Sequence, residues 1–323
     1  MVKNMEKLDF LTEEQFIQLE ILEKYDRQCA ITDFSILLGG AVSSSYHTSE
    51  GNSLKDRTGW WWTKTSLLDY ACVVCSDGNS DGYDVGTREI GARPVLPYSA
   101  ISENSMNVVR GLNGIFEVEY GEYPQYVVSE DFSRTLESAY LNRTINQTDK
   151  KYTTDSVHPH DFDTSFQARE HIEYEYNGKK YIRFVGDSNC EGCVLSDGRK
   201  IQEGGVYWVE VEPIKWMIDE KNNIVLSKKI IFAGVQFDVQ EYYTGDFENT
   251  TICIFLNEIF AKDIIPSVID KTVEQMLEEK EQLLQELKVI QEGQQKLLVR
   301  ETELVARIEH IQTEIKDKGQ YGK

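Results

Sequence analysis

Residues 173–185 read EYEYNGKKYIRFV, and this stretch carries the clearest structural signal of the chain. Aromatic or apolar residues alternate with charged ones on both sides of Asn177-Gly178. That dipeptide is favoured in the two-residue turn that joins antiparallel strands, because both of its residues tolerate a positive φ. The stretch therefore predicts a β-hairpin, and the surrounding sequence shows what the hairpin belongs to.

Further strands are expected on either side of the hairpin. Residues 115–128 (IFEVEYGEYPQYVV) alternate like a strand that is interrupted at Pro124. Short aromatic and β-branched runs broken by Gly and Asp predict strands and loops over 58–99. Additional strands are predicted at 206–211, 214–219 and 224–227. The polar residues 135–171 predict a long loop or insertion, and Gly39 to Ser53 a shorter loop.

Helical patterns occupy both ends of this strand-rich region. Residues 11–25 begin with Thr12 and Gln15 at capping-box spacing, and residues 250–265 return to helical spacing of apolar residues. The mixture predicts an α+β fold. We expect an N-terminal helix and loop region over 1–57 and an α+β body over 58–262, which can divide into 58–110 and 115–262.

The composition changes sharply after Pro266. Residues 267–317 contain no proline, one glycine and no aromatic ring, and their apolar residues recur every seven positions. This repeat predicts a long helix in a coiled coil, and because an apolar stripe is unfavourable in water, also a homo-oligomer. Gly293 leaves a helical hairpin as the alternative to one continuous helix. The residues predicted to form the oligomer contact are Met276, Leu283, Leu287, Ile290, Leu297, Leu304, Ile308 and Ile311.

Charge and composition narrow the classes of function. The 323 residues carry a net charge of −21, which disfavours direct binding to nucleic acid or to an anionic membrane and favours a basic protein partner. No signal-peptide pattern and no membrane span is apparent. Six cysteines in this length are too few for a disulfide-stapled secreted scaffold, so we expect a cytoplasmic protein.

Two Cys-x-x-Cys pairs could hold zinc. Cys72 and Cys75 form one pair, Cys190 and Cys193 the other, and four thiolates can complete a tetrahedral site. Gly192 would supply the turn in the second pair. Buried free cysteines are the alternative, which we favour because the pairs are far apart in the chain.

Two other segments contain metal-capable side chains. Asp77, Asn79 and Asp81 precede Gly82 as in the first half of a calcium loop, but the twelfth position is Arg88 instead of a bidentate glutamate. A solvated turn is the favoured alternative. His158 and His160 lie in a polar loop near Asp163. We therefore expect no obligatory cofactor.

Three consecutive tryptophans suggest a partner surface. In a strand, Trp60 and Trp62 would share one face while Trp61 takes the other, so one face could enter the core and the other could contact a partner. Core packing on both faces is the alternative.

Several short motifs together resemble a known family. They are Tyr120-Gly-Glu-Tyr-Pro-Gln125, Pro213-Ile-Lys-Trp216, Leu226-Ser-Lys228, Leu256-Asn257, Trp61-Trp62 and Arg93-Pro-Val-Leu96. The chain resembles an uncharacterised bacterial and phage domain family that is similar to the C-type-lectin-like fold, which formylglycine-generating enzymes also use. The tryptophan and Arg-Pro blocks come first here, although they come last in the family. The resemblance implies loops on a rigid sheet used for binding, and it adds Arg93 to the predicted partner surface.

These observations lead to one main prediction of function. We expect a non-enzymatic protein-binding module, displayed in several copies by its C-terminal coiled coil, because no catalytic motif is recognisable. One alternative is an acidic, phage-encoded inhibitor that blocks a nucleic-acid-processing defence protein by imitating phosphate charge. A metal-dependent enzyme is the second alternative.

Overall fold

The computed structural model describes residues 7–19, 27–48, 53–67, 70–98, 108–110, 115–157, 164–239, 243, 245–264, 300 and 303–308. The chain divides into two compact units, Met1–Pro266 and Ser267–Lys323, which we call the body and the tail. Residues 1–57 belong to the same unit as the predicted 58–262 region, and they share one hydrophobic core with it. In the tail, residues 303–308 are helical.

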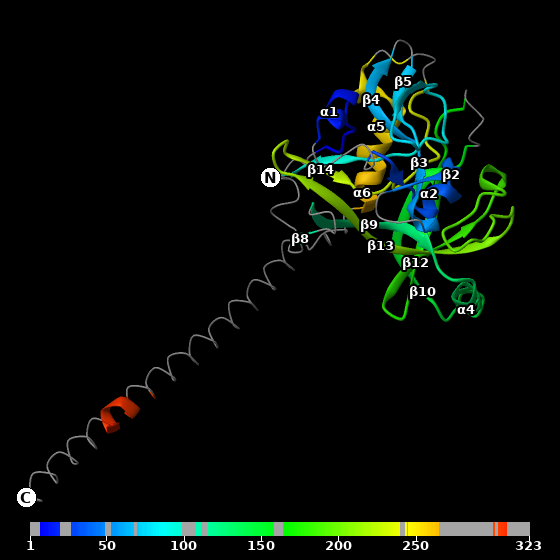
Figure 1. Ribbon diagram of the computed structural model, residues 1–323. Coiled ribbons are helices and arrows are strands. Elements are labelled where there is room, and N and C mark those ends of the chain that lie inside the picture. Colours follow the sequence, from blue (N-terminus) through cyan, green and yellow to red (C-terminus); the bar gives the residue numbers. More distant parts are fainter. Residues whose placement is uncertain are drawn as a thin grey trace, which may run out of the picture. The chain divides into compact units, whose positions relative to one another are not determined.

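The body contains helices and a sheet-rich core, as the predicted α+β class requires. Its largest sheet has the strand order β10-β11-β12-β13-β14-β7, and β9 joins it by pairing with β13 (Figure 1). β8 pairs with β9. The strands of this sheet are β7 (Val95–Pro97), β8 (Val108–Arg110), β9 (Phe116–Val127), β10 (Asn146–Asp155), β11 (Ala168–Tyr176), β12 (Lys179–Val185), β13 (Val206–Asp219) and β14 (Ile224–Ser227).

The predicted hairpin is confirmed as β11 and β12. Tyr176 pairs with Lys179 across the turn, and both Asn177 and Gly178 have positive φ (52° and 76°). Because these two residues adopt left-handed conformations readily, the turn matches the twist of its strands. The local signal was sufficient to fix the register.

β13 is one long strand where two were predicted. It continues through Pro213, and three strands pair with it. β9 follows it from Val209 to Met217, whereas β12 pairs with 206–210 and β14 with 216–219. A strand has two edges, so β12 and β14 must share the edge opposite β9. None of the strands that the structure describes pairs with residues 211–215 on that edge.

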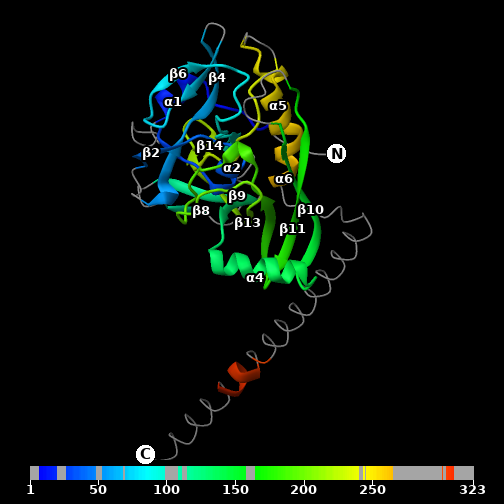
Figure 2. The same ribbon diagram turned by 90° about the vertical axis from the view of Figure 1, so that its right-hand side faces the viewer.

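The segment predicted as a long loop contains regular structure. It includes the end of helix α4 (Glu130–Leu141), all of strand β10 and the start of β11. α4 places Phe132, Leu136 and Tyr140 on one face at four-residue spacing, and this face packs on Tyr174, Tyr181 and Trp208 in a small second core. Tyr174, Tyr181 and Trp208 belong to β11, β12 and β13, and Figure 2 shows α4 lying across the ends of the strands. Polar residues obscured this narrow apolar stripe in the sequence.

The N-terminal region contains more regular secondary structure than the predicted helix and loop. Helix α1 (Glu13–Gln18) has the predicted capping box, in which Thr12 and Gln15 bond each other's backbone N–H. Part of the loop expected from Gly39 to Ser53 is strand β2. The three-stranded sheet here has the order β1-β3-β2, formed by β1 (Cys29–Ala30), β3 (Arg57–Gly59) and β2 (Val42–His47). Helix α2 (Asp33–Leu37) is buried beside it, and the 3₁₀ turn η1 (Leu54–Asp56) precedes β3.

The remaining elements close the main core. β4 (Trp61–Leu67), β5 (Tyr70–Val74) and β6 (Ser80–Tyr83) form a third sheet, and the short 3₁₀ turns are η2 (Ser188–Cys190) and η3 (Phe247–Asn249). The predicted helix at 250–265 is confirmed as α5 (Thr251–Phe255), a π-helical turn η4 (Leu256–Phe260) and α6 (Ala261–Ile264). Over the described residues, no helix is long and apolar enough to span a membrane.

Candidate functional site

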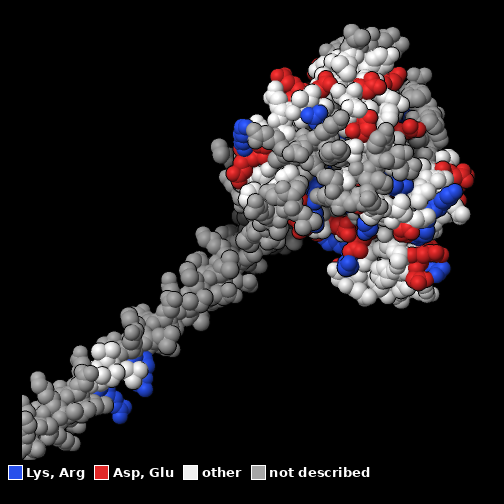
Figure 3. Space-filling view, in the orientation of Figure 1, with Lys and Arg blue, Asp and Glu red and all other residues white. Residues whose placement is uncertain are grey.

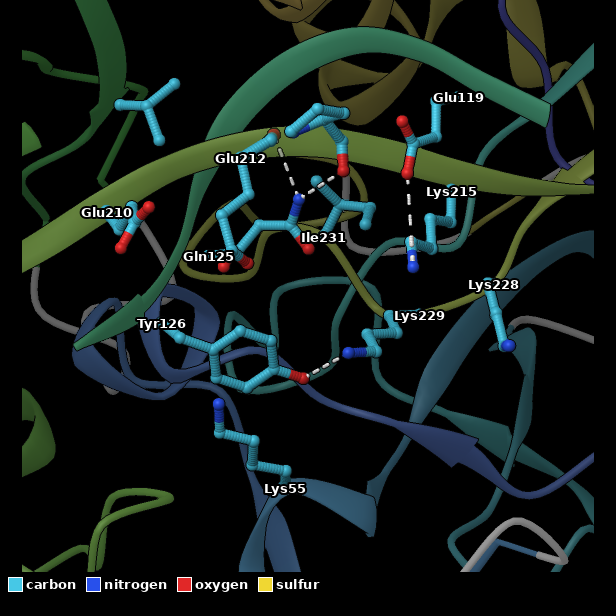
Figure 4. Close-up of a pocket in the computed structure, with 12 residues that line it drawn as sticks. Lys55, Glu119, Gln125, Tyr126, Glu210, Glu212, Lys215, Lys228, Lys229 and Ile231 are labelled. Atoms are coloured by element: carbon cyan, nitrogen blue, oxygen red, sulfur yellow. Dashed lines mark hydrogen bonds and ion pairs between the residues drawn. The ribbon is translucent and has the colours of Figure 1, made fainter. Parts of the chain in front are cut away.

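A pocket of about 450 Å³ lies where β13 lacks a strand partner. Val211, Glu212, Pro213 and Lys215 line it from that open edge. Its other walls come from η1, from the end of β9 and from the chain after β14 (Figure 4). We call it the lysine pocket, and its full lining is Lys55, Glu119, Gln125, Tyr126, Glu210, Val211, Glu212, Pro213, Lys215, Lys228, Lys229 and Ile231.

A β-bulge in β9 brings two consecutive residues to this pocket. Tyr126 pairs with Glu210 and Pro124 with Val211, which leaves Gln125 as the extra residue. Successive side chains of a regular strand point to opposite faces, but a bulge re-aims one of them. Gln125 and Tyr126 therefore both line the pocket.

The bulge also fixes the orientation of the Gln125 amide. Its Nε2 donates to the backbone oxygens of Glu212 (3.0 Å) and Pro213 (2.9 Å), and the side chain is 5% exposed. Figure 4 shows the amide nitrogen directed at β13 and the amide oxygen pointing into the pocket. The pocket thus presents a fixed hydrogen-bond acceptor.

Two lysines converge on the ring of Tyr126. The Nζ of Lys55 lies 4.6 Å and the Nζ of Lys229 lies 4.4 Å from the ring centroid, and they approach from two sides (Figure 4). Lys229 also donates a 2.5 Å hydrogen bond to the phenol oxygen. Within the described part of the chain, neither lysine forms an ion pair. We call Lys55 and Lys229 the lysine pair.

All but one of the other charged groups of the pocket have ion-pair partners; the exception among the described residues is Glu212, whose charge acts on Lys229 and Lys55. Lys215 lies 3.9 Å from Glu119, Lys228 bonds Glu117 at 2.8 Å, and Glu210 accepts from Lys179 at 2.6 Å. Four lysines and three glutamates line the pocket, so its formal charge is +1 in a chain of net charge −21. Among the described residues, the lining groups without an ion pair are Lys55, Lys229 and Glu212, which together carry the charge of +1.

Burial shifts the ionisation of three groups here. It lowers the pKa of Lys229, and the nearby cations Lys228, Lys55 and Lys215 lower it further, while Glu212 opposes them. Burial raises the pKa of Tyr126 above its ordinary value, so its phenol stays neutral. Burial also raises the pKa of Glu212. The positive charge of Lys229 is therefore only partly compensated by the negative charge of Glu212.

This arrangement suits a small anion. An anion between Lys55 and Lys229 would accept charge-assisted hydrogen bonds and relieve the repulsion between them. The amide oxygen of Gln125 could accept a hydrogen bond from a donor beside the anion.

A second cation–aromatic group, beneath α4, is arranged differently. Arg183 lies 4.9 Å from the Tyr140 ring centroid and donates to both carboxylate oxygens of Glu137, at 2.9 and 2.8 Å. Glu137 also accepts from the Trp208 indole at 3.0 Å. We call these four residues the α4 cluster. Its charges are paired internally.

The predicted tryptophan surface is wrong for three of its four residues. Trp61, Trp62 and Arg93 are at most 2% exposed and cannot contact a partner of the folded body. The predicted alternation holds, because Trp61 packs on Phe16 and Trp62 on Phe237, but both faces of β4 are covered. Arg93 stacks on Trp61 and donates to the Ser227 oxygen.

Trp60 is partly exposed. Its ring makes an edge contact with Tyr83 at 5.3 Å, and its indole N–H donates to Ser76.

The structure does not bring the four candidate zinc ligands together in one cluster. Cys72, Cys75, Cys190 and Cys193 are all described and all free, and the described residues include no cluster of His, Cys, Asp and Glu that could hold a metal. The predicted turn at Gly192 is present, with φ of 81°. Burial raises the pKa of Cys72 and Cys75 to about 11 and that of Cys190 to about 12, which disfavours the thiolate that metal binding requires.

The predicted calcium loop is a hairpin turn between β5 and β6. The Asp77 carboxylate accepts from the backbone and side-chain nitrogens of Asn79, at 3.0 and 2.8 Å. Asp81 is already in β6, opposite Val73, and its carboxylate accepts from Gly82 N. Both carboxylates thus accept hydrogen bonds within the hairpin, which fits the solvated turn favoured from the sequence.

Most of the predicted oligomer contact lies outside the described residues. That holds for Met276, Leu283, Leu287, Ile290, Leu297 and Ile311, and also for His158, His160 and Asp163. Leu304 and Ile308 are described, and both are about half exposed (48% and 54%).

Sequence reasoning did not find the lysine pocket, although one signal pointed to it. The motif segments 120–125, 213–216 and 226–228 lie on or beside β9, β13 and β14 and supply Gln125, Pro213, Lys215 and Lys228 to the lining. Lys55 and Lys229 lie outside those segments, and nothing in their local sequence distinguishes them from surface lysines.

Comparison of the chain with models of known protein families, with curated proteins and with solved structures finds no match.

Proposed function

We propose that the chain is a non-enzymatic binding protein and that the lysine pocket holds a carboxylate of its ligand. The observation that carries this proposal is the lysine pair, two ammonium groups within 4.6 Å of one tyrosine ring with no ion pair to a described residue. Leaving two like charges together costs free energy, which a bound carboxylate would recover.

The charge of the lining favours a carboxylate over a phosphate. Four lysines and three glutamates give +1, which a monoanion neutralises and a dianion exceeds. The glutamates would also repel the additional charge of a phosphate. Gln125 favours a ligand with a hydroxyl or N–H beside the carboxylate, since its fixed oxygen accepts hydrogen bonds.

Titration with three small probes tests this proposal. Lactate should bind, lactamide should not because it lacks the charge, and inorganic phosphate should compete poorly. Lys229→Met should weaken lactate binding by about tenfold or more, the usual scale for one hydrogen bond to a charged group. Lys262→Met is the matched control, because Lys262 is an exposed lysine that pairs with Glu258.

Calorimetry or NMR shifts would give the affinities. Equal binding of lactate and lactamide, or tighter binding of phosphate, would contradict the carboxylate proposal.

We also propose that the tail forms a coiled coil that assembles several bodies. Leu304, Val305 and Ile308 support this, because they are about half exposed on a helical segment and occupy apolar positions of the predicted heptad repeat. Light scattering of the full chain should give a mass above that of one copy, and Leu304→Asp with Ile308→Asp should lower it. Leu141→Asp, at an exposed position of α4, is the control. A full chain with the mass of one copy would contradict this proposal.

A basic protein partner remains part of the proposal. Figure 3 shows acidic side chains spread over the described surface in view, with basic ones between them, and the net charge is −21. Proteins retained from a lysate should elute as salt rises, because screening weakens contacts between exposed charges. Retention of an acidic protein that resists salt would contradict a basic partner.

The relation to the C-type-lectin-like family is likewise proposed. Its support is that three of the motif segments lie on or beside strands that pair in one sheet. A solved structure of a protein with the same motifs but a different strand order would contradict it.

A further inference from the structure

The backbone on both sides of Lys229 is anchored, which positions its side chain in the lysine pocket. Lys228 N donates to the Lys215 oxygen at 2.9 Å, and Ile230 N donates to the Ala30 oxygen at 2.9 Å. Ser227 Oγ donates to the Lys229 oxygen at 3.0 Å. The residue is thus held between β13 and β1, and its Nζ reaches the Tyr126 phenol.

The surroundings of this amine increase the fraction of it that is neutral. The groups that act on its charge are one carboxylate, several cations and a neutral phenol from four parts of the fold: Glu212, Lys215, Lys228, Lys55 and Tyr126. Burial and the cations outweigh Glu212 and lower the pKa of Lys229. A neutral amine is a nucleophile, and burial beside other cations is a known way to activate lysine.

We propose that Lys229 captures a carbonyl: it forms a reversible imine with a 2-oxo carboxylate bound in the lysine pocket. The inference rests on the proposed function, since the pocket must first hold the carboxylate. Nζ attacks the carbonyl carbon to give a carbinolamine, which loses the former carbonyl oxygen as water and leaves the C=N bond. The two protons of that water come from the amine, so the step needs no oxidant or reductant.

The geometry of the lysine pair favours this class of ligand. A 2-oxo acid has its carbonyl carbon directly attached to the carboxylate. Both Nζ atoms lie within 4.6 Å of the centroid of the Tyr126 ring, so a carboxylate held at Lys55 would keep the adjacent carbonyl inside the pocket that Lys229 also lines. The Tyr126 phenol, already hydrogen-bonded to Nζ, could donate to the departing oxygen.

Reductive trapping tests the inference. The full chain is incubated with pyruvate and cyanoborohydride at neutral pH, and modified lysines are identified by peptide mass spectrometry. Lys229 should be labelled preferentially, because each unit by which a pKa is lowered gives about tenfold more neutral amine. Lys262, exposed and ion-paired, is the internal reference. Equal labelling of Lys229 and Lys262 would overturn the inference.

Two variants separate the imine from simple binding. Lys229→Arg keeps the positive charge but cannot form an imine, so it should abolish the preferential adduct. Lys55→Met should reduce both lactate binding and trapping at Lys229, and thermal melting verifies that each variant is folded. If lactate binds and pyruvate is not trapped, the imine alone fails; if lactate does not bind either, the proposed function fails as well.

Discussion

The lysine pair and the α4 cluster have similar components, but the cation of the α4 cluster has a carboxylate partner and the lysine pair has none among the described residues. Two lysines lie within 4.6 Å of the Tyr126 ring centroid, and one arginine lies 4.9 Å from the Tyr140 ring centroid. In the α4 cluster, Glu137 bonds both ends of the guanidinium and also the Trp208 indole. At Tyr126, neither lysine has a carboxylate partner among the residues that the structure describes.

This difference separates a structural contact from a candidate binding site. A cation on an aromatic ring with its counter-ion already present stabilises the fold and has little left to offer a ligand. The same cation without a counter-ion contributes less to stability and retains its affinity for an anion. Substitutions in the α4 cluster should therefore change stability, whereas those at the lysine pair should change binding.

The largest effect is expected for Leu136→Ala. Leu136 is fully buried between α4 and the strands, and removing its side chain leaves a cavity in the small second core. We expect a loss of about 3 kcal/mol in the free energy of unfolding, measured by denaturant titration. Leu141→Ala, in the same helix but 70% exposed, should change it by less than about 0.5 kcal/mol.

Lactate binding by folded Leu136→Ala should match that of the unsubstituted chain. A parallel loss of lactate affinity would show that the two regions are coupled, and it would contradict the assignment of stability to one region and binding to the other.

The next effect is expected for Glu137→Gln, with a loss of about 1.5 kcal/mol, because a neutral amide replaces an acceptor of charge-assisted bonds. Its hydrogen bond with Arg183 lowers the pKa of Glu137 below the ordinary 4.5. The unfolded chain therefore takes up this proton more readily, and the contribution of Glu137 is lost as pH falls below 4.5.

The stability difference between the chain and Glu137→Gln should stay constant from neutral pH down to about pH 5 and shrink below it. Glu130→Gln, in an exposed pair with Arg134, should have an effect below about 0.5 kcal/mol at every pH. A pH-independent difference for Glu137→Gln would show that the carboxylate charge is not what stabilises the cluster.

Local signals predicted the hairpin and the capping box, because each depends on residues within four positions. Asn177-Gly178 set the turn, and Thr12 with Gln15 set the start of α1. The stripe of α4 was missed because Phe132, Leu136 and Tyr140 alternate with many polar residues, so its existence depends on the strands that it covers.

The lysine pocket could not be predicted in the same way. Lys55, Tyr126 and Lys229 meet where no described strand pairs with residues 211–215 on one edge of β13 and where β9 bulges at Gln125. Both are properties of strand pairing that no single segment encodes. The prediction of an exposed tryptophan surface was wrong for a related reason. The alternation of side chains predicts which face of β4 each ring takes, but it does not predict that both faces are covered.

The smallest effect on stability is expected for Lys229→Met, and its sign is the sharpest test of the comparison. Methionine keeps an unbranched apolar stem against the Tyr126 ring and removes the uncompensated charge. The lowered pKa of Lys229 means that its protonated form costs stability below the ordinary 10.5, and that this cost fades as pH rises toward that value. At neutral pH and low salt, the variant should be as stable as the unsubstituted chain or more stable by about 0.5 kcal/mol.

The corresponding substitution in the α4 cluster, Arg183→Met, should instead cost about 2 kcal/mol, because it leaves Glu137 without its partner. Chemical denaturation of the two variants side by side measures the contrast, and a comparable loss in both would mean that Lys229 is a structural residue like Arg183.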